Sequence, residues 1–599
     1  MVLTLLLVSI LTFAFNIQPV EAEPRTWTVD DDGPADFHTI QEAINAANDG
    51  NRILVKNGAY HEHIVVNKTV SLIGEGNPTI DGDFSSNDMI QLVADDIYIS
   101  GFIIQRTHRY GVSLSGVSGC EIEKINLIDT RYGIKLYDAE GNRIRKSIVE
   151  VTSVSEGLFC WSQGIDLQPF SNDNEVSANN ITGLTFGIHV ANANRNTINS
   201  NRICECSTAI WLEMGSYNLI FGNNITDSSG GHASGVRFGY EFSEGNYIGH
   251  NLLNGASIIC DQFIRGSGNI IEHNRLQNAV YGIMLVQIDD FQRANLVRFN
   301  ELHNCTYGIA LCSYDIVCIG NTVFESEYAL WVLSLGNCTY TKNVILNSKY
   351  ALYVAECKNG VFSHNTILNS SYLLSGASPS GMLVLHHNNF IENSGGFDAD
   401  MLQWDDGMLP NPEGNYWSDY DGQDDGSGIG RFGESRIEGD GVGDTDVPHH
   451  GLDWYPLMEP WTTTINATIY IVPNTLNLRA KPAYVSAFIE LPEGYNVSDI
   501  DVSSILLNNT IAVDPDAPTA IGDYDDDGIP DLMVKFDRAE VASYILANVN
   551  MTKLHEERFM TMTLTITGKL NDGTVFQGSD TIRIMMPMPR GGGRRSFLK

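Results

Sequence analysis

The chain has 599 residues, a net charge of −37 at pH 7 and 43% hydrophobic residues. A chain of this length can bury a large core and is expected to form more than one domain. The negative charge argues against nucleic acid as a partner, because phosphates require a cationic surface. It fits a solvated extracellular protein that binds calcium where its acidic residues cluster.

Residues 1–22 have the pattern of a signal peptide. Residues 2–15 are mainly apolar, and VEA at residues 20–22 provides a small-residue cleavage site. No Lys or Arg precedes the apolar stretch, so an uncleaved anchor is the alternative. No other segment reaches the roughly 20 apolar residues of a membrane span. We therefore expect a protein that is secreted or held at the cell surface, without an integral membrane span after signal cleavage.

Residues 23–60 are expected to form an N-terminal cap. The sequence TIQE at residues 39–42 is a capping box, and the apolar residues after it follow helical spacing. The pattern predicts a short helix that ends before Gly50. A solenoid requires such a plug over its first open coil.

Residues 61–393 carry twelve copies of a five-residue pattern, in which a small residue precedes alternating apolar residues, as in Tyr132-Gly133-Ile-Lys-Leu136. Alternation is typical of strands, and recurrence at the length of one coil indicates stacked coils. An Asn recurs in a second register, where its amides can form ladders between coils. These residues are Asn179, Asn201, Asn223, Asn251, Asn274, Asn300, Asn321, Asn343, Asn365 and Asn388. The two registers predict a parallel β-helix.

All ten cysteines lie between Cys120 and Cys357, inside the repeats. Most do not share a position in neighbouring coils, and Cys318 and Cys338 come closest to doing so. We expect buried core cysteines with at most one or two disulfides.

The last third of the chain changes character. Residues 394–462 are rich in Asp, Gly and aromatic residues, which predicts an ordered but irregular C-terminal cap. Residues 463–588 contain short alternating segments between Pro- and Asp-rich turns, as in a β-sandwich. Residues 589–599 are expected to be a disordered tail. The predicted fold is all-β: a parallel β-helix followed by a β-sandwich.

The strongest local signal is DYDDDGIPD at residues 523–531, which matches the first nine positions of an EF-hand-type loop. The expected calcium ligands are Asp523, Asp525, Asp527, the carbonyl of Ile529 and Asp531. Position twelve is Val534 in place of Glu, so Asp537 or water must supply the remaining ligand. The ion would be structural, and an acidic turn without metal is the alternative. Asp440 and Asp444 form a weaker version of this pattern.

A second candidate site follows from the fourth residue of each five-residue copy, which is expected to point outward. Lys135, Asp166, His189, Trp211 and Arg237 would then form one stripe on coils about 4.8 Å apart, with Glu213 beside it. Such a charged and aromatic stripe would suit a polysaccharide. An ordinary solvated face is the plainer interpretation. From Ile259 onward the same position is largely apolar, so any ligand is expected on the N-terminal half.

The stripe also contains the candidate catalytic residues Asp166, Glu213, Lys135 and Arg237. Asp166 and Glu213 lie two coils apart, roughly 10 Å on the coil spacing, at the upper edge for an inverting glycosidase. No cluster of carboxylates with a nearby Arg or Lys base is evident, as a calcium-assisted lyase would need. An enzyme is therefore the less favoured interpretation.

Histidines raise a third interpretation. His250 and His273 each precede a ladder Asn in successive coils, and His364 and His387 do so further on. Imidazoles stacked in this way could share a copper ion. The absence of Met- and His-rich clusters favours ordinary turn histidines.

Several motifs resemble those of a known family. WTVDDDG at 27–33, IQEAI at 40–44 and IDG at 80–82 are similar to the N-terminal signature of exported right-handed β-helix proteins. More specific matches are GNYWSDY at 414–420, GDGVGD at 439–444 and DWYPLM at 453–458. Over roughly residues 25–462 the chain resembles the archaeal NosD-type group of periplasmic copper-binding and carbohydrate-binding β-helix proteins.

The resemblance implies a right-handed, pectate-lyase-like β-helix and leaves the function open, because one fold supports many functions. We favour an exported, calcium-stabilised protein that binds a polysaccharide or cell-surface glycan. The alternatives are a polysaccharide hydrolase or lyase acting on the stripe, and a NosD-type copper-binding accessory protein.

Overall fold

The computed structural model divides the chain into two compact units, Met1–Glu459 and Pro460–Lys599. It describes residues 24–151, 161–227, 233–239, 243–260, 267–286, 294–376, 382–395, 402–462, 464–478, 483–492, 495–525, 527–549, 559–571 and 574–585. The predicted signal peptide and the predicted C-terminal tail lie outside these residues. In the described part of the chain, no helix has the length and apolar character needed to cross a membrane.

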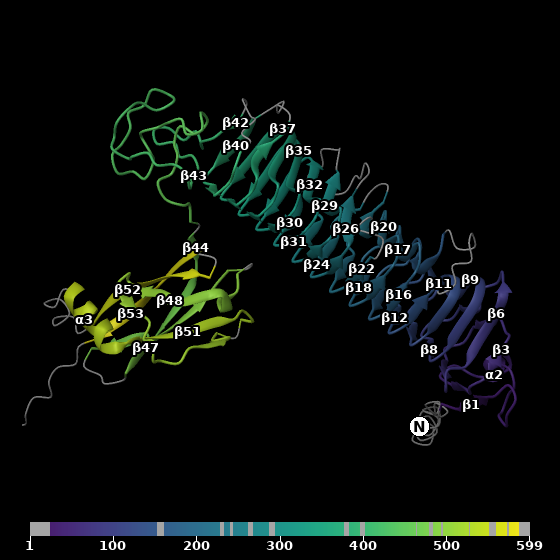
Figure 1. The fold of residues 1–599 in the computed structure, drawn as a ribbon. Helices are drawn as coiled ribbons and strands as arrows, with labels where there is room; N and C mark the ends of the chain where they lie inside the picture. Colours follow the sequence, from purple (N-terminus) through teal and green to yellow (C-terminus); the bar gives the residue numbers. More distant parts are fainter. Residues whose placement is uncertain are drawn as a thin grey trace, which may run out of the picture. The chain divides into compact units, whose positions relative to one another are not determined.

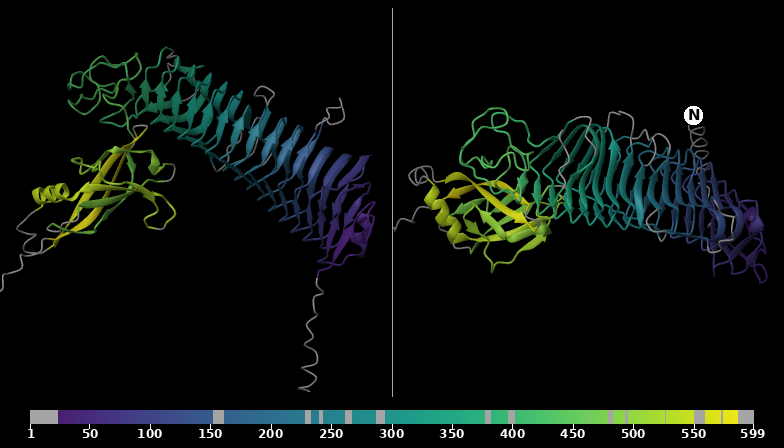
Figure 2. Two further views of the ribbon diagram at one scale, coloured as in Figure 1. Left: turned by 60° about the horizontal axis from the view of Figure 1, so that its bottom comes forward. Right: turned by 45° about the horizontal axis from the view of Figure 1, so that its top comes forward.

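The first unit contains a parallel β-helix whose coils stack in chain order (Figures 1 and 2). Each full coil contributes strands to three stacks, which we call the first, second and third faces. The first face consists of β1 (Thr26–Val29), β2 (Arg52–Val55), β5 (Ser71–Gly74), β8 (Tyr98–Ser100), β10 (Glu121–Glu123), β12 (Arg143–Arg145), β15 (Glu175–Ser177), β18 (Thr197–Asn199), β21 (Leu219–Phe221), β24 (Tyr247–Gly249), β27 (Ile270–Glu272), β30 (Asn295–Arg298), β33 (Ile316–Ile319), β40 (Met382–His386) and β42 (Leu402–Gln403).

The other two faces are built in the same way. The second face consists of β3 (Ala59–Tyr60), β6 (Thr79–Ser85), β13 (Ile148–Glu150), β16 (Asn180–Thr182), β19 (Arg202–Cys204), β22 (Asn224–Thr226), β25 (Leu252–Asn254), β28 (Arg275–Gln277), β31 (Glu301–His303), β34 (Thr322–Phe324), β36 (Val344–Leu346), β38 (Thr366–Leu368), β41 (Asn389–Ile391) and β43 (Tyr416–Trp417). The third face consists of β4 (Ile64–Val66), β7 (Ile90–Leu92), β14 (Gln163–Leu167), β17 (Phe186–Ala191), β20 (Thr208–Glu213), β23 (Ala233–Phe238), β26 (Ala256–Cys260), β29 (Tyr281–Val286), β32 (Tyr307–Ser313) and β39 (Tyr372–Ser375).

Four long strands turn a corner between faces. β9 (Ile103–Ser115) and β11 (Asn126–Tyr137) run from the second face into the third. β35 (Tyr328–Thr341) and β37 (Tyr350–Ser363) run from the third face into the first of the next coil.

The five-residue repeat forms the third-face strands, and its aliphatic residues fill the core. Ile165, Ile188 and Ile210 lie in register on successive strands and are fully buried. Each such side chain contributes about 1.5–3 kcal/mol through burial. The repeat begins its apolar part with a small residue for a steric reason. A Cβ on Gly164, for example, would lie 2.4 Å from the carbonyl oxygen of Gly187.

Two buried asparagine ladders run along the solenoid. The predicted ladder is present from Asn179 to Asn388, with each Nδ2 donating to the Oδ1 of the next Asn at 2.9–3.0 Å. It continues to Asn415 and ends at Asp453, whose Oδ2 accepts from Asn415 and from the Trp417 indole. A second ladder, which was not predicted from the sequence, comprises Asn142, Asn174, Asn196, Asn218, Asn246, Asn269 and Asn295.

The N-terminal opening is covered by the predicted helix, α2 (Ile40–Ala46). The Thr39 hydroxyl accepts from the backbone N–H of Glu42, and Ile40 and Ile44 are buried against the first coils. At the other end, residues 402–459 form an irregular cap in which Trp404, Trp417 and Tyr455 are buried.

Cysteines contribute to the core as thiols. The eight described cysteines are thiols and not disulfides, and all except Cys312 are buried. Strand register places Tyr340, not Cys338, beside Cys318. These two cysteines therefore do not share a position, and Cys338 lies two residues before the register partner of Cys318.

The second unit contains two sheets around their own core. One comprises β44 (Thr464–Asn466), β46 (Thr475–Asn477), β48 (Ile500–Leu507), β49 (Ile511–Ala512), β52 (Phe559–Leu570) and β53 (Val575–Met585). The other comprises β45 (Thr468–Val472), β47 (Tyr484–Glu490), β50 (Ala520–Gly522) and β51 (Asp531–Asp537). A 3₁₀ turn, η1 (Val497–Asp499), and a helix, α3 (Arg538–Asn548), complete the unit; neither was predicted.

Candidate functional site

The third face carries the charged stripe on five successive strands, β11, β14, β17, β20 and β23. The register pairs Lys135 with Asp166, Asp166 with His189, His189 with Trp211, and Trp211 with Arg237. These five residues align because each occupies the fourth position of its copy, and the inward aliphatic residues on either side fix the strand register.

One imidazole lies between two carboxylates at the centre of the stripe. His189 Nδ1 is 3.0 Å from Asp166 Oδ1, and His189 Nε2 is 3.0 Å from Glu213 Oε2. We call this arrangement the Asp166–His189–Glu213 cluster. Both ring nitrogens are used, so the ring is fixed in orientation on both sides.

The cluster is not the solvated surface that we expected from the outward repeat position. Asp166 is 0% exposed and His189 is 7% exposed. The hydroxyl of Tyr110 donates to Asp166 Oδ2 at 3.1 Å, and the Gln168 amide donates to the same oxygen at 2.8 Å. These side chains cover the carboxylate and satisfy it at the same time.

The electrostatics of the cluster favour a charged imidazole. Burial opposes protonation of His189, but the hydrogen bonds to Asp166 and Glu213 and their negative charges raise its pKa to about 9. His189 is therefore a cation at neutral pH, held between two anions. Since neither carboxylate is left without a partner, the cluster does not resemble a carboxylate pair of which one member protonates a leaving group.

Aromatic rings form one wall of the site. Trp211 stacks on His189 at 4.6 Å and on Phe186 at 4.7 Å between ring centroids. Phe186 in turn contacts Trp161 at 5.9 Å, and Trp161 is 61% exposed. At the other end, the Lys135 ammonium lies 5.3 Å from the Tyr110 ring centroid. Trp161 was not predicted as a site residue, because it precedes the five-residue copy and so has no repeat position.

The predicted calcium loop lies between β50 and β51 in the second unit. Its side chains form two overlapping groups in which the ligand oxygens all lie within 4.8 Å of one another: Glu490 with Asp525 and Asp527, and Asp523 with Asp525 and Asp531. Asp531 Oδ2 accepts from the Tyr524 N–H, whereas the buried Asp531 Oδ1 has no hydrogen-bond partner. A buried carboxylate oxygen without a donor is suited to a cation.

The extra acidic residue at this loop is Glu490, and not Asp537. Asp537 lies at the far end of β51, where its carboxylate caps α3 by accepting from the N–H groups of Ala539 and Glu540. Glu490 is brought to the loop because it pairs with Asp531 across β47 and β51. Strand pairing of this kind is not visible in the spacing of the loop itself.

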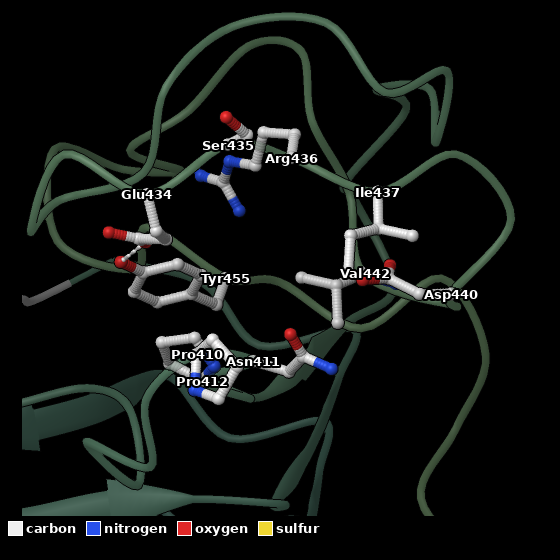
Figure 3. A pocket seen from close by; sticks show the side chains of 10 residues that line it. All are labelled: Pro410, Asn411, Pro412, Glu434, Ser435, Arg436, Ile437, Asp440, Val442 and Tyr455. Carbon is white, nitrogen blue, oxygen red and sulfur yellow. Dashed lines mark hydrogen bonds between the residues drawn. The ribbon is translucent and has the colours of Figure 1, made fainter.

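The weaker acidic pair lies in the cap, beside a cavity of about 20 Å³ (Figure 3). Asp440 lines this cavity, whose rim also carries Arg436 and the hydrogen-bonded pair Glu434 and Tyr455. Asp444 is engaged elsewhere, since it accepts from Gly426 and lies near Arg436. Among the described residues, no metal-ligating group of three includes either aspartate.

The predicted copper histidines stack without converging on a point. The rings of His250 and His273 are parallel within 5° at 5.0 Å, and Phe299 continues the stack. His387 instead pairs with Glu413 at 2.7 Å, and burial with nearby imidazoles lowers the pKa of His364 to about 4. In the part of the chain that the structure describes, none of these four histidines belongs to a metal-ligating group of three.

Comparison with known proteins assigns a family. The family described as "Periplasmic copper-binding protein (NosD)" matches residues 44–259 and 240–422, which together make up more than half of the chain. The chain belongs to the NosD family. This agrees with the resemblance inferred from the sequence motifs.

A curated relative and several solved structures are also similar. A cell surface glycoprotein of Methanothermus fervidus is 26% identical over 238 residues, which cover 33% of this chain and 39% of the relative. The chain thus spans about two fifths of that relative. Solved structures include PfbA, a surface adhesin of Streptococcus pneumoniae, at 14% identity and a TM-score of 0.36 over 56% of this chain and 88% of PfbA. Another is the tailspike of E. coli bacteriophage HK620, at 10% identity and a TM-score of 0.37 over 91% of this chain and 88% of the tailspike.

Proposed function

We propose that this NosD-family protein is a cell-surface or secreted β-helix protein that binds a polysaccharide or glycan on its third face. The observation that carries the proposal is Trp161, an exposed indole that contacts the aromatic wall of the Asp166–His189–Glu213 cluster. An exposed aromatic ring beside fixed polar groups offers an apolar surface for the C–H face of a sugar and partners for its hydroxyls. The name of the curated relative, a cell surface glycoprotein, supports the location.

Rigidity also favours recognition by this site. His189, Trp211 and Phe186 are locked by stacking and hydrogen bonds, so little side-chain entropy is lost when a ligand binds. Glu213 retains partial exposure, with 27% of its side chain accessible, and can accept a hydrogen bond from a sugar hydroxyl. Lys135 offers a positive charge along the same stripe, which would suit an acidic polysaccharide.

A glycan array probed with the purified full-length protein tests this proposal. We expect binding that Trp161→Ala weakens at least tenfold, because the ring supplies the main apolar contact. Phe84→Ala is the matched control, since Phe84 is an exposed aromatic residue of an N-terminal coil, outside the site. Equal binding by Trp161→Ala and the control contradicts the assignment. Release of new reducing ends from the bound glycan would show that the protein is a hydrolase or lyase and not only a binding protein.

We also propose that the loop formed by Asp523, Asp525, Asp527, Ile529 and Asp531 binds a structural calcium ion, with Glu490 as an additional acidic ligand. The clustered oxygens and the unpartnered Asp531 Oδ1 support it. Calorimetric unfolding with calcium and with EDTA is the test. A melting temperature of the second unit that chelation leaves unchanged contradicts this proposal.

A further inference from the structure

The C-terminal cap brings two histidines and one aspartate together at a single point. His449 Nε2 lies 3.1 Å from Asp419 Oδ1, and His450 Nε2 lies 3.0 Å from Asp419 Oδ2. The ligand atoms of the three side chains all lie within 4.8 Å of one another. Among the described residues, this is the metal-ligating group of three that contains imidazole; the other such groups are entirely acidic.

The backbone explains why two consecutive side chains converge. In an extended chain, neighbouring side chains point to opposite faces. His450 instead adopts a left-handed backbone with φ of 50°, in a tight reversal that pairs His449 with Asp453. Asp453 is fully buried at the end of the asparagine ladder, so the reversal is anchored to the solenoid.

Aromatic side chains hold the two imidazoles in place. The Trp417 ring meets the rings of His449 and His450 edge-on at 5.3 and 5.2 Å, and Tyr420 meets His449 in the same way at 5.2 Å. Trp417 is itself fixed by its indole hydrogen bond to Asp453. On the outer side the cluster is open, because 59% of the Asp419 side chain is exposed.

We propose that Asp419, His449 and His450 bind a divalent first-row transition-metal ion. Two imidazole nitrogens and one carboxylate are a donor set for Zn²⁺, Cu²⁺ or Fe²⁺, and not for calcium, which takes oxygen ligands. The open side leaves coordination positions for water or a further ligand. The two Nε2 atoms already converge on one carboxylate, and a divalent ion replaces the hydrogens that link them to it. The site is independent of the proposed glycan site and of the calcium loop.

Isothermal titration of the untagged full-length protein with Cu²⁺ and with Zn²⁺ tests this assignment. We expect one saturable site per chain, together with a Cu²⁺ electron paramagnetic resonance spectrum that shows coupling to two nitrogens. In His449→Gln/His450→Gln the tight site should be lost. Asp419→Asn should weaken it by at least tenfold, and because Asp419 is exposed this variant is not expected to unfold.

The double variant His250→Gln/His273→Gln is the matched control, since it removes two neighbouring imidazoles elsewhere in the solenoid. It should retain the affinity and the spectrum of the parent protein. The proposal is overturned if the parent shows no saturable site, if His449→Gln/His450→Gln retains its circular dichroism and its tight site, or if the tight site disappears in His250→Gln/His273→Gln.

Discussion

Two clusters in the first unit combine imidazole and carboxylate in opposite ratios. On the third face, one histidine lies between two carboxylates; in the cap, two histidines share one carboxylate. The pKa of His189 is raised to about 9 because its two anionic partners outweigh burial. The pKa of His449 is lowered, because burial and the neighbouring His450 outweigh the hydrogen bond to Asp419 and the negative charges of Asp419 and Asp421. The ratio of partners thus separates a held cation from a neutral ring.

Replacement of Asp166 should produce the largest effect on this comparison. Asp166→Ala leaves His189 with one carboxylate and removes the acceptor of Tyr110 and Gln168. We expect a loss of about 3–5 kcal/mol in unfolding free energy, as for other broken buried ion pairs. Equilibrium denaturation of the variant measures it. Ser113→Ala, at the same repeat position on β9, should change stability by no more than about 0.5 kcal/mol; an equal loss in both variants would contradict the special role of the cluster.

The pH dependence of stability should reveal the cation. The folded pKa of His189, about 9, lies above its usual value of 6.5. Its contribution is therefore complete below about pH 6.5 and is lost as the pH rises through 9, and its size is roughly 3 kcal/mol at 1.36 kcal/mol per pKa unit. The difference in unfolding free energy between parent and His189→Gln should shrink over this range. A difference that stays constant from pH 6 to 10 would show that the ring is neutral.

Glu213 should matter less than Asp166. Part of its side chain remains exposed, so solvent screens the interaction with His189. Glu213→Gln keeps a hydrogen-bond acceptor, and we expect a loss of about 1 kcal/mol in unfolding free energy. The His189 pKa should also fall, as measured from the imidazole proton resonances. A loss as large as that of Asp166→Ala would show that the two carboxylates are equivalent.

The smallest effect is expected in the cap. Without metal, His450→Gln removes a partly exposed ring with one carboxylate partner, so the melting temperature should change little, by the equivalent of about 0.5 kcal/mol. Addition of Zn²⁺ should raise the melting temperature of the parent and not that of the variant. If Zn²⁺ raises the melting temperature of both proteins equally, His450 is not a metal ligand.

The sequence predicted the repeating part of the fold better than the sites on it. The small and aliphatic residues represented by Gly164, Ile165 and Leu167 recur in twelve copies, and this regularity predicted strands, register and one asparagine ladder. The burial of Asp166 was not predicted, because Tyr110 lies two coils earlier and the repeat does not show that its hydroxyl reaches this carboxylate.

The acidic loop and the histidine cluster of the cap were only partly predicted for the same reason. The acidic loop is local and was recognised, whereas Glu490 reaches it through strand pairing. His449 and His450 were overlooked because adjacent residues seldom converge, and only the left-handed backbone at His450 brings them together. Pairing and backbone conformation are properties of the folded chain, which the spacing of residues does not carry.

The aspartate that ends the asparagine ladder has one further consequence. Each asparagine both accepts from the previous coil and donates to the next, so the ladder could continue indefinitely. The carboxylate of Asp453 accepts from Asn415 but has no amide hydrogen to pass on. The Asp453 side chain therefore offers no amide donor with which a further coil could extend the row of hydrogen bonds. A single oxygen in place of an amide nitrogen thus ends the row of amide hydrogen bonds inside the cap.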